Sequence, residues 1–93
     1  TPGDIQSEDQ LEPGEGAIIR NGLSKEAVYR GTDGNLHKCS ATCPHLGCIV
    51  RWSKTEKIWN CPCHGSRFDR YGKVITGPSR ADLSPIKTPI SYG

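Results

Sequence analysis

Residues 43–66 read CPHLGCIVRWSKTEKIWNCPCHGS, and they hold four of the five cysteines and two of the three histidines of this 93-residue chain. These side chains gather in two short segments, 43–48 (CPHLGC) and 61–66 (CPCHGS). Fifteen residues separate His45 from Cys61, enough for a β-hairpin that carries both segments at its open end. The sequence therefore predicts two neighbouring loops that face one metal centre.

Each segment offers one cysteine and one histidine, as Cys43-x-His45 and Cys61-x-x-His64. Two thiolates on one iron and two imidazoles on the other are the ligands of a Rieske [2Fe-2S] centre, whose reduction potential lies above that of plant-type ferredoxins. The alternative is a structural zinc site, which takes four nitrogen and sulfur ligands. The C-x-H pair is shorter than the C-x₂₋₄-C spacing of zinc modules, which favours iron.

Two further cysteines, Cys48 and Cys63, stand one in each segment and have no role in a four-ligand zinc site. A disulfide between them would tie the loop tips together, if the geometry allows it. Gly47 and Gly65 stand beside the candidate ligands, where the missing side chain lets backbone N–H groups approach inorganic sulfur. These features favour the iron–sulfur centre over zinc.

The two segments resemble the cluster-binding loops of the disulfide-containing Rieske proteins of respiratory and photosynthetic quinol-oxidising complexes. The similarity continues through Phe68-Asp69 and Gly72 to residues 77–79 (GPS), which are similar to the Gly-Pro-x-Pro loop that covers the cluster. Upstream segments resemble a narrower group, the C-terminal Rieske domains of bacterial FAD-dependent oxidoreductases of the amino-acid-oxidase type. These segments are 13–17 (PGEGA), 27–30 (AVYR) and 33–37 (DGNLH).

The resemblance implies a role for each residue of the loops. Cys43 and Cys61 are expected to bind the buried iron, His45 and His64 to bind the outer iron, and Cys48 and Cys63 to form the disulfide. The hydroxyl of Ser66 and the amides near Gly47 and Gly65 are expected to tune the reduction potential.

Three positions depart from the pattern of the quinol-oxidising proteins. Phe68 stands where a tyrosine usually donates to a ligand sulfur, so we expect a potential below that of those proteins and above that of plant-type ferredoxins. Arg80 replaces the second proline of the cover loop, which weakens the case for quinol docking. Pro44 replaces a common threonine and only fixes the backbone between ligands.

The implied function is one-electron transfer by the C-terminal domain of a FAD-dependent oxidoreductase, with the FAD in the parent protein and not in this domain. The domain is expected to have no catalytic activity by itself and to exchange electrons with the flavin domain of the same chain or with another redox protein. One alternative is a soluble fragment of a quinol-oxidising cytochrome complex, for which quinol is the partner. Others are a Rieske ferredoxin of an oxygenase, whose loops generally lack the extra cysteine pair, and a zinc-binding module.

The composition predicts an all-β fold, because 11 glycines and 7 prolines give many turns and no segment reads as an amphipathic helix. The resemblance specifies a Rieske-type antiparallel β-sandwich or incomplete barrel with a small cluster-binding subdomain of two loops. Turns are expected at residues 32–35 and 69–72. The expected strands span residues 17–20, 26–31, 35–40, 49–53, 57–61, 72–75 and 86–90.

The first fifteen residues hold five acidic side chains and no Lys or Arg, which predicts a linker or tail at 1–15 and the Rieske domain at 16–93. The domain then has a net charge of about +7, which could guide an acidic partner protein. Aromatic and basic residues do not alternate as in nucleic-acid-binding proteins, so no nucleic acid partner is expected.

No apolar stretch of the chain is long enough to span a membrane, and Thr1 is expected not to be a natural start. The expected location is cytoplasmic, and the alternative is membrane association through a missing N-terminal segment. Trp52 and Trp59 are expected to pack the core rather than relay electrons. Cys39 is expected to be a buried, unreactive thiol and His37 an ordinary residue of the surface or core edge.

Overall fold

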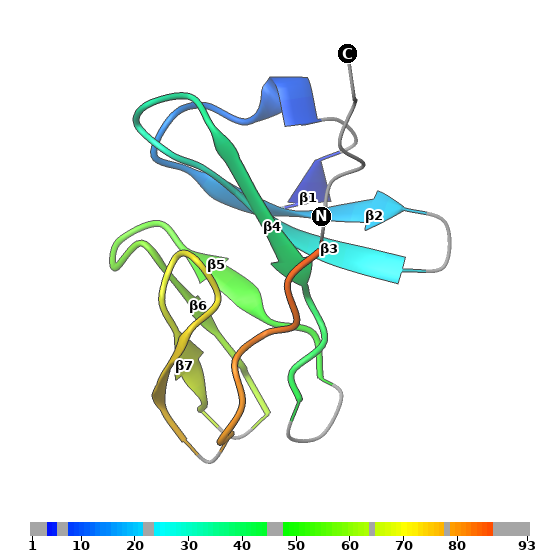
Figure 1. Ribbon diagram of the computed structural model, residues 1–93, viewed down its shortest axis with the longest axis vertical. Coiled ribbons are helices and arrows are strands. Elements are labelled where there is room, and N and C mark those ends of the chain that lie inside the picture. Colours follow the sequence, from blue (N-terminus) through cyan, green and yellow to red (C-terminus); the bar gives the residue numbers. More distant parts are fainter. Residues whose placement is uncertain are drawn as a thin grey trace.

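The computed structural model describes residues 4–5, 8–21, 24–44, 48–63, 65–77 and 79–86, and its eight described strands form two four-stranded sheets (Figure 1). The first sheet contains β1 (Asp4–Ile5), β2 (Gly16–Asn21), β3 (Ser24–Arg30) and β4 (Leu36–Ser40) in that order. The second contains β5 (Arg51–Ser53), β6 (Ile58–Asn60), β7 (Arg67–Phe68) and β8 (Val74–Thr76). A 3-10 helix (Glu8–Gln10) is the only helix in the described residues. The all-β prediction is confirmed.

Strand β2 is buried on both faces, which explains its apolar run. Because successive side chains of a strand point to opposite faces, Ile18 joins the core between the two sheets, whereas Ala17 and Ile19 join a second cluster on the other face. Leu11, from the segment before β2, covers that second cluster and is itself buried. One residue outside the expected domain boundary therefore contributes to a core.

Strands β2, β3 and β4 form an antiparallel meander closed by the predicted turn. The amide of Gly31 donates to the carbonyl of Asn35 at 2.8 Å, and Asp33 accepts from the amide of Asn35 at 3.0 Å. Gly34 has φ +90°, a conformation that glycine adopts at no steric cost. The turn at residues 32–35 is confirmed.

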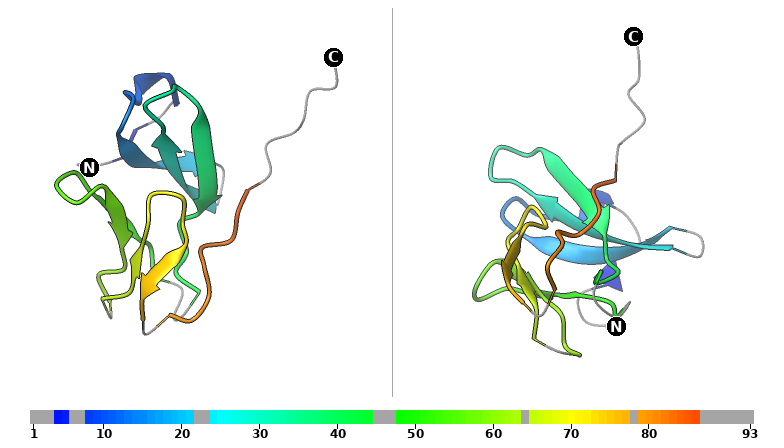
Figure 2. Two further views of the ribbon diagram at one scale, coloured as in Figure 1. Left: turned by 60° about the vertical axis from the view of Figure 1, so that its left-hand side comes forward. Right: turned by 60° about the horizontal axis from the view of Figure 1, so that its bottom comes forward.

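The second sheet is built on the predicted tryptophan hairpin. Trp52 and Trp59 are directly opposed in β5 and β6, and their ring centroids lie 4.9 Å apart. Trp59 is fully buried, and Trp52 packs against the backbone of Gly16, where a Cβ would lie 2.6 Å from the indole ring. The two sheets lie next to each other (Figure 2). Trp59 belongs to the core cluster and Trp52 packs against it, so the prediction that both tryptophans belong to the core is confirmed.

The N-terminal segment is packed on the first sheet where it is described. Strand β1 pairs in parallel with β2, with Ile5 opposite Ile19, which is the one parallel pairing among the described strands. The sequence analysis missed this two-residue strand. The domain boundary at residue 15 stays a prediction.

The remaining strand predictions differ at the ends. The expected strand at 72–75 is found as Val74–Thr76, after the predicted turn in which the Gly72 amide donates to the Asp69 carbonyl at 2.9 Å. Strand β7 was missed, because two residues give no periodic pattern. The expected strand at 86–90 lies almost wholly outside the described residues.

Candidate metal centre

The first loop, Cys43–Cys48, lies between β4, the last strand of the first sheet, and β5, the first strand of the second sheet. The Cys43 amide donates to the Cys48 carbonyl at 2.7 Å, and the flanking residues Thr42 and Ile49 form an isolated antiparallel bridge. The Val50 amide donates to the Ala41 carbonyl at 2.8 Å. These contacts close the loop at its base without a strand of regular length on either side.

The second loop, Cys61–Ser66, connects β6 to β7 and is closed in the same way. The Cys61 amide donates to the Ser66 carbonyl at 2.8 Å, and the Gly65 amide donates to the Cys61 carbonyl at 2.9 Å. Gly65 has φ +81°, so the reversal of the chain in this loop uses a conformation that other residues rarely adopt.

Four of the five cysteines lie in these loops, in two chemical states. A disulfide joins Cys48 to Cys63 with a Cα–Cα distance of 6.4 Å, the pairing that the resemblance implied. Cys43 and Cys61 are free thiols, 1% and 2% exposed, and both belong to the core cluster between the sheets. The Cys61 sulfur lies within 4.8 Å of both disulfide sulfurs.

This donor set fits one half of the expected cluster. The two free thiols stand at the first position of each loop, shielded from water, and thiolates are the ligands that iron–sulfur clusters take. The sulfurs of Cys48 and Cys63 are bonded to each other, so Cys43 and Cys61 are the two loop cysteines with a free thiol, and their role as cluster ligands stays a prediction. His45, His64 and Gly47 lie outside the described residues, so their roles stay predictions.

Ser66 is fully buried at the end of the second loop, and its hydroxyl has a defined partner. Its oxygen accepts a hydrogen bond from the amide of Ser79 at 3.0 Å. A hydroxyl has one proton and two lone pairs, so this contact leaves the proton free to be donated elsewhere. The tuning role of Ser66 stays a prediction, and the contact with Ser79, which the sequence analysis missed, ties the segment after Gly77 to the loop.

Phe68 is fully buried in β7, opposite Trp59 of β6 and Val74 of β8. The side chain brings no hydroxyl to the end of the sheet that carries the loops. The indole N–H of Trp59, the residue opposite Phe68, donates to the carbonyl of Arg70 at 3.2 Å. The position where the quinol-oxidising proteins usually have a donor is therefore apolar in this chain.

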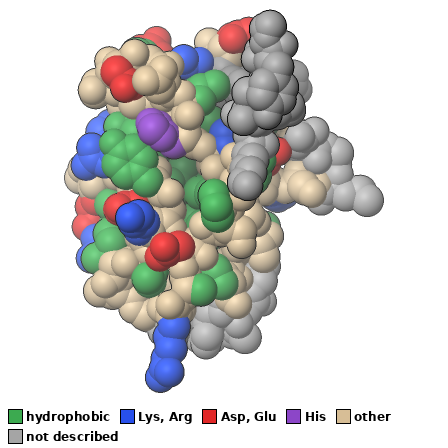
Figure 3. All heavy atoms as spheres, viewed as in Figure 1, with side chains coloured by type: hydrophobic (Ala, Val, Ile, Leu, Met, Phe, Trp, Pro, Cys, Tyr) green, Lys and Arg blue, Asp and Glu red, His purple; other side chains and the backbone are tan. Residues whose placement is uncertain are grey.

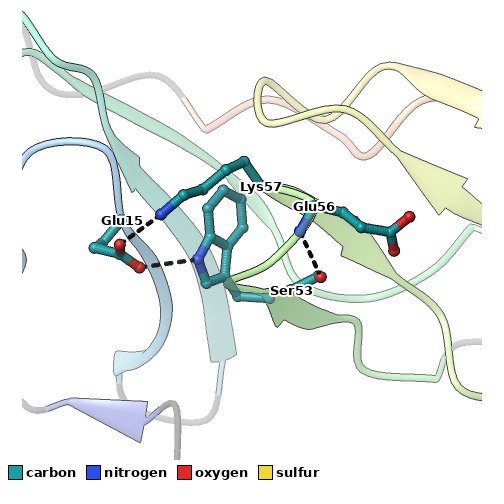
Figure 4. A network of polar contacts seen from close by, with 5 residues as sticks. Glu15, Ser53, Glu56 and Lys57 are labelled. Carbon is teal, nitrogen blue, oxygen red and sulfur yellow. Dashed lines mark hydrogen bonds and ion pairs between the residues drawn. The ribbon is translucent and has the colours of Figure 1, made fainter.

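The opposite end of the tryptophan hairpin is held by a polar network that sequence reasoning also missed (Figure 4). Glu15 accepts from the ammonium of Lys57 at 2.6 Å and from the indole N–H of Trp52 at 3.4 Å. The hydrogen bond from Lys57 is the main cause that lowers the pKa of Glu15 below its usual value. Lys57 has φ +59°, a backbone conformation that residues with a side chain rarely adopt. The turn, and not the preference of lysine, therefore fixes its backbone.

The fifth cysteine lies apart from the loops. Cys39 is a buried free thiol on β4, and its sulfur lies 3.7 Å from the carbonyl oxygen of Ala27. Burial raises its pKa to about 12, so the thiol is protonated and unreactive at neutral pH. The prediction of a buried, unreactive thiol is confirmed. His37 is half-buried and contacts Tyr29 and Tyr71, as expected for the core edge.

The family model described as Rieske [2Fe-2S] domain matches residues 2–88. The chain is 43% identical over 84 residues to the Rieske 2Fe-2S iron-sulfur protein YhfW of Bacillus subtilis, covering 90% of this chain and 16% of that protein. It is 43% identical over 88 residues to the cytochrome b6-f complex iron-sulfur subunit 2 of the Cyanophora paradoxa cyanelle, covering 87% of this chain and 36% of that subunit.

Among solved structures, the plasma membrane Rieske protein PetC3 of Synechocystis PCC 6803 aligns with a TM-score of 0.76 and 30% identity, covering 95% of this chain and 90% of that one. In contrast, the chain spans only 16% of the length of YhfW and 36% of the length of the Cyanophora paradoxa subunit, which is well under half of each. No helix in the described residues is long and apolar enough to cross a membrane.

Proposed function

The chain belongs to the Rieske [2Fe-2S] domain family, and from this premise we propose that it transfers single electrons through a cluster bound by Cys43, Cys61, His45 and His64. Domains of this family bind a [2Fe-2S] cluster, which takes up and releases one electron at a potential raised by its histidine ligands. The observation that carries the proposal is the pair of buried free thiols at matching positions of two loops that a disulfide joins. In this role the domain moves electrons and converts no substrate by itself.

The residues of this chain would position and tune the centre. Cys43 and Cys61 would hold it from the core side, where burial keeps water from their sulfurs. The amide of Ser79 fixes the oxygen of Ser66, so that the hydroxyl proton is available to a sulfur atom. Such a donor stabilises the reduced state, which carries the additional negative charge.

The named relatives favour a quinol-oxidising complex as the parent assembly. Cytochrome b6-f subunits of two lineages, Cyanophora paradoxa and Chlorobaculum tepidum, are 43% and 34% identical to the chain. The disulfide between Cys48 and Cys63 also fits that class. In this context the partners would be quinol and a cytochrome complex, and the domain would be associated with a membrane through a part of the protein outside this sequence.

A FAD-dependent oxidoreductase is the second candidate parent, and Phe68 is the observation that favours it. Its buried ring replaces a hydroxyl donor, which would lower the reduction potential below the range suited to quinol oxidation. The match to YhfW covers only 16% of that protein, so this domain can also be a small part of a much longer chain. In this context a flavin domain of the same chain would be the electron partner and the location would be cytoplasmic.

The charges near the loops support an acidic docking partner in either context. The segments 40–53, 60–68 and 76–81 contain three arginines and no Asp or Glu. Arg51 and Arg80 are exposed, whereas Arg67 forms an ion pair with Glu56. On the face seen in Figure 3, hydrophobic, basic and acidic side chains are interspersed. Opposite charge on a partner would speed its encounter with the loop end of the domain.

Low-temperature EPR during stepwise reduction tests both the cluster and the parent. A rhombic signal with an average g below 2, together with iron and acid-labile sulfide in the same sample, is expected. A signal that needs dithionite would support the flavoenzyme, and a signal that appears with ascorbate would support quinol oxidation. A colourless, zinc-containing protein would contradict the proposal.

Phe68→Tyr is expected to raise the reduction potential, because it restores a hydroxyl that can donate to a ligand sulfur. The measurement is a redox titration followed by EPR. Phe68→Leu is the matched control, since it changes the packing at the same position and adds no donor. An equal potential in both variants would show that the missing hydroxyl does not set the potential.

A further inference from the structure

Three sulfur atoms of two different chemical kinds lie together in the loops. The free thiol of Cys61 and the two sulfurs of the Cys48–Cys63 disulfide all lie within 4.8 Å of one another. Among the described residues, Cys43 is not part of this group. A thiol held this close to a disulfide meets it at a very high effective concentration, which favours intramolecular exchange; Cys39, which is also buried, has no disulfide within reach among the described residues.

We propose that Cys61 and the Cys48–Cys63 disulfide form an exchange site that acts whenever Cys61 is not bound to iron. The Cys61 thiolate attacks the sulfur of Cys48, a Cys48–Cys61 bond forms, the Cys48–Cys63 bond breaks, and Cys63 leaves as a thiolate that takes up the proton lost by Cys61. The step is redox-neutral, so no outside oxidant or reductant is needed.

The connectivity of the chain favours this product over the one in which Cys61 bonds to Cys63. The sequence separation of the bonded cysteines changes only from 15 to 13 (residues 48 and 61), so the entropy of loop closure is nearly the same before and after. Attack on Cys63 would instead join Cys61 to a cysteine only two residues away, and so short a segment cannot reach disulfide geometry without strain. Attack on Cys48 is therefore preferred to attack on Cys63.

The consequence concerns reassembly of the metal centre. Once Cys61 is in a disulfide it cannot ligate iron, so a domain that has lost its cluster would rebuild it only after Cys63 attacks the new bond and restores the original pairing, a reversal that an added thiol would speed up. The free Cys63 would meanwhile be the reactive, exposed thiol of the domain. The inference rests on the proposed function only for when the exchange occurs, namely while Cys61 is not bound to iron. The exchange itself needs no cluster.

Two ligand variants provide a matched test that does not depend on cluster chemistry. Cys43→Ser and Cys61→Ser each lack one proposed thiolate ligand, but only Cys43→Ser keeps the nucleophile. Each variant is kept under argon without added thiol, labelled with N-ethylmaleimide while folded, and then labelled with iodoacetamide after denaturation. Trypsin releases peptides 39–51 and 58–67, and fragmentation at Pro62 separates Cys61 from Cys63.

In Cys43→Ser we expect N-ethylmaleimide on Cys63 in most molecules, with Cys48 bonded to Cys61. In Cys61→Ser we expect the Cys48–Cys63 bond to persist and neither cysteine to be labelled. The proposal is overturned if Cys43→Ser keeps the Cys48–Cys63 bond, or if it forms a Cys61–Cys63 bond. It is also overturned if the buried Cys39 takes up N-ethylmaleimide in the folded sample, because the exchange then reflects unfolding.

The EPR result is independent of this outcome. A Rieske signal in the wild-type domain with no exchange in Cys43→Ser would leave the electron-transfer function in place and remove only the exchange site. Exchange in Cys43→Ser with a colourless wild-type protein would support the exchange site and contradict the electron-transfer function.

Discussion

The two cluster loops have the same pattern of residues and backbone hydrogen bonds, but different contacts hold their last residues. Both begin with Cys-Pro, both have glycine at the fifth position, and both are closed by a hydrogen bond from the first amide to the last carbonyl. The first loop ends in Cys48, which is covalently bonded to the other loop. The second ends in Ser66, which lies next to β7 and accepts from the amide of Ser79. Both loops are closed by their own backbone hydrogen bonds and share the disulfide, and the second loop has in addition the contact with Ser79, which does not involve the first loop.

Of the variants considered, removal of the disulfide should have the largest effect on stability and on the difference between the two loops. For the double variant Cys48→Ala/Cys63→Ala we expect the free energy of unfolding to fall by about 3 kcal/mol, because the unfolded chain is no longer crosslinked. Hydrogen exchange should speed up at the amide of Cys43 more than at the amide of Cys61. Urea unfolding and amide exchange by NMR measure the two effects. Equal loss of protection in both loops would show that the second loop also depends on the disulfide.

Ser66→Ala should act on the second loop in the same manner and with a smaller effect. The amide of the buried Ser79 loses its acceptor, which costs about 1–3 kcal/mol. We also expect a lower reduction potential, since a donor near the sulfur atoms is lost. Ser79→Ala is the control, because it keeps the backbone amide and removes only the hydroxyl contacts with Ala81. If Ser79→Ala lowers the potential as much as Ser66→Ala, the hydroxyl of Ser66 is not the cause.

Gly65→Ala should strain the second loop by about 1 kcal/mol, because a residue with a side chain is forced into the left-handed region. Among the described residues other than its chain neighbours, no atom lies within 4 Å of the added Cβ, so the cost is one of backbone conformation. Thermal unfolding is the measurement. Gly77→Ala, at a position without a positive φ and with only ordinary contacts to Ser79, should leave stability nearly unchanged. Equal losses in the two variants would contradict the assignment of strain to Gly65.

The comparison also shows where sequence reasoning succeeds. The tryptophan hairpin and the turn at residues 32–35 are local patterns, and each predicted a feature that the structure contains. The Cys48–Cys63 disulfide, which the structure also contains, was implied by the resemblance of the two loops to a known family. Strand β7, the Ser79 contact and the Glu15 network depend on residues distant in sequence or on segments of two residues. Such features carry no period and no motif, because tertiary packing creates them.

The smallest expected effect concerns Glu15, at the end of the hairpin opposite both loops. Its pKa is lowered in the folded state, so its contribution to stability is present above the usual value of 4.5 and is lost as the pH falls through the lower, folded-state pKa. Glu15→Gln should therefore cost about 0.2–1 kcal/mol at neutral pH, typical of exposed ion pairs, and progressively less in acid. Glu12→Gln removes the same charge from the same segment and is the control. Urea unfolding from neutral to acidic pH measures both variants. Because the network lies at the far end of the hairpin from both loops, amide exchange in the two loops should respond equally, whereas an unequal response would mean that the hairpin transmits strain to one loop.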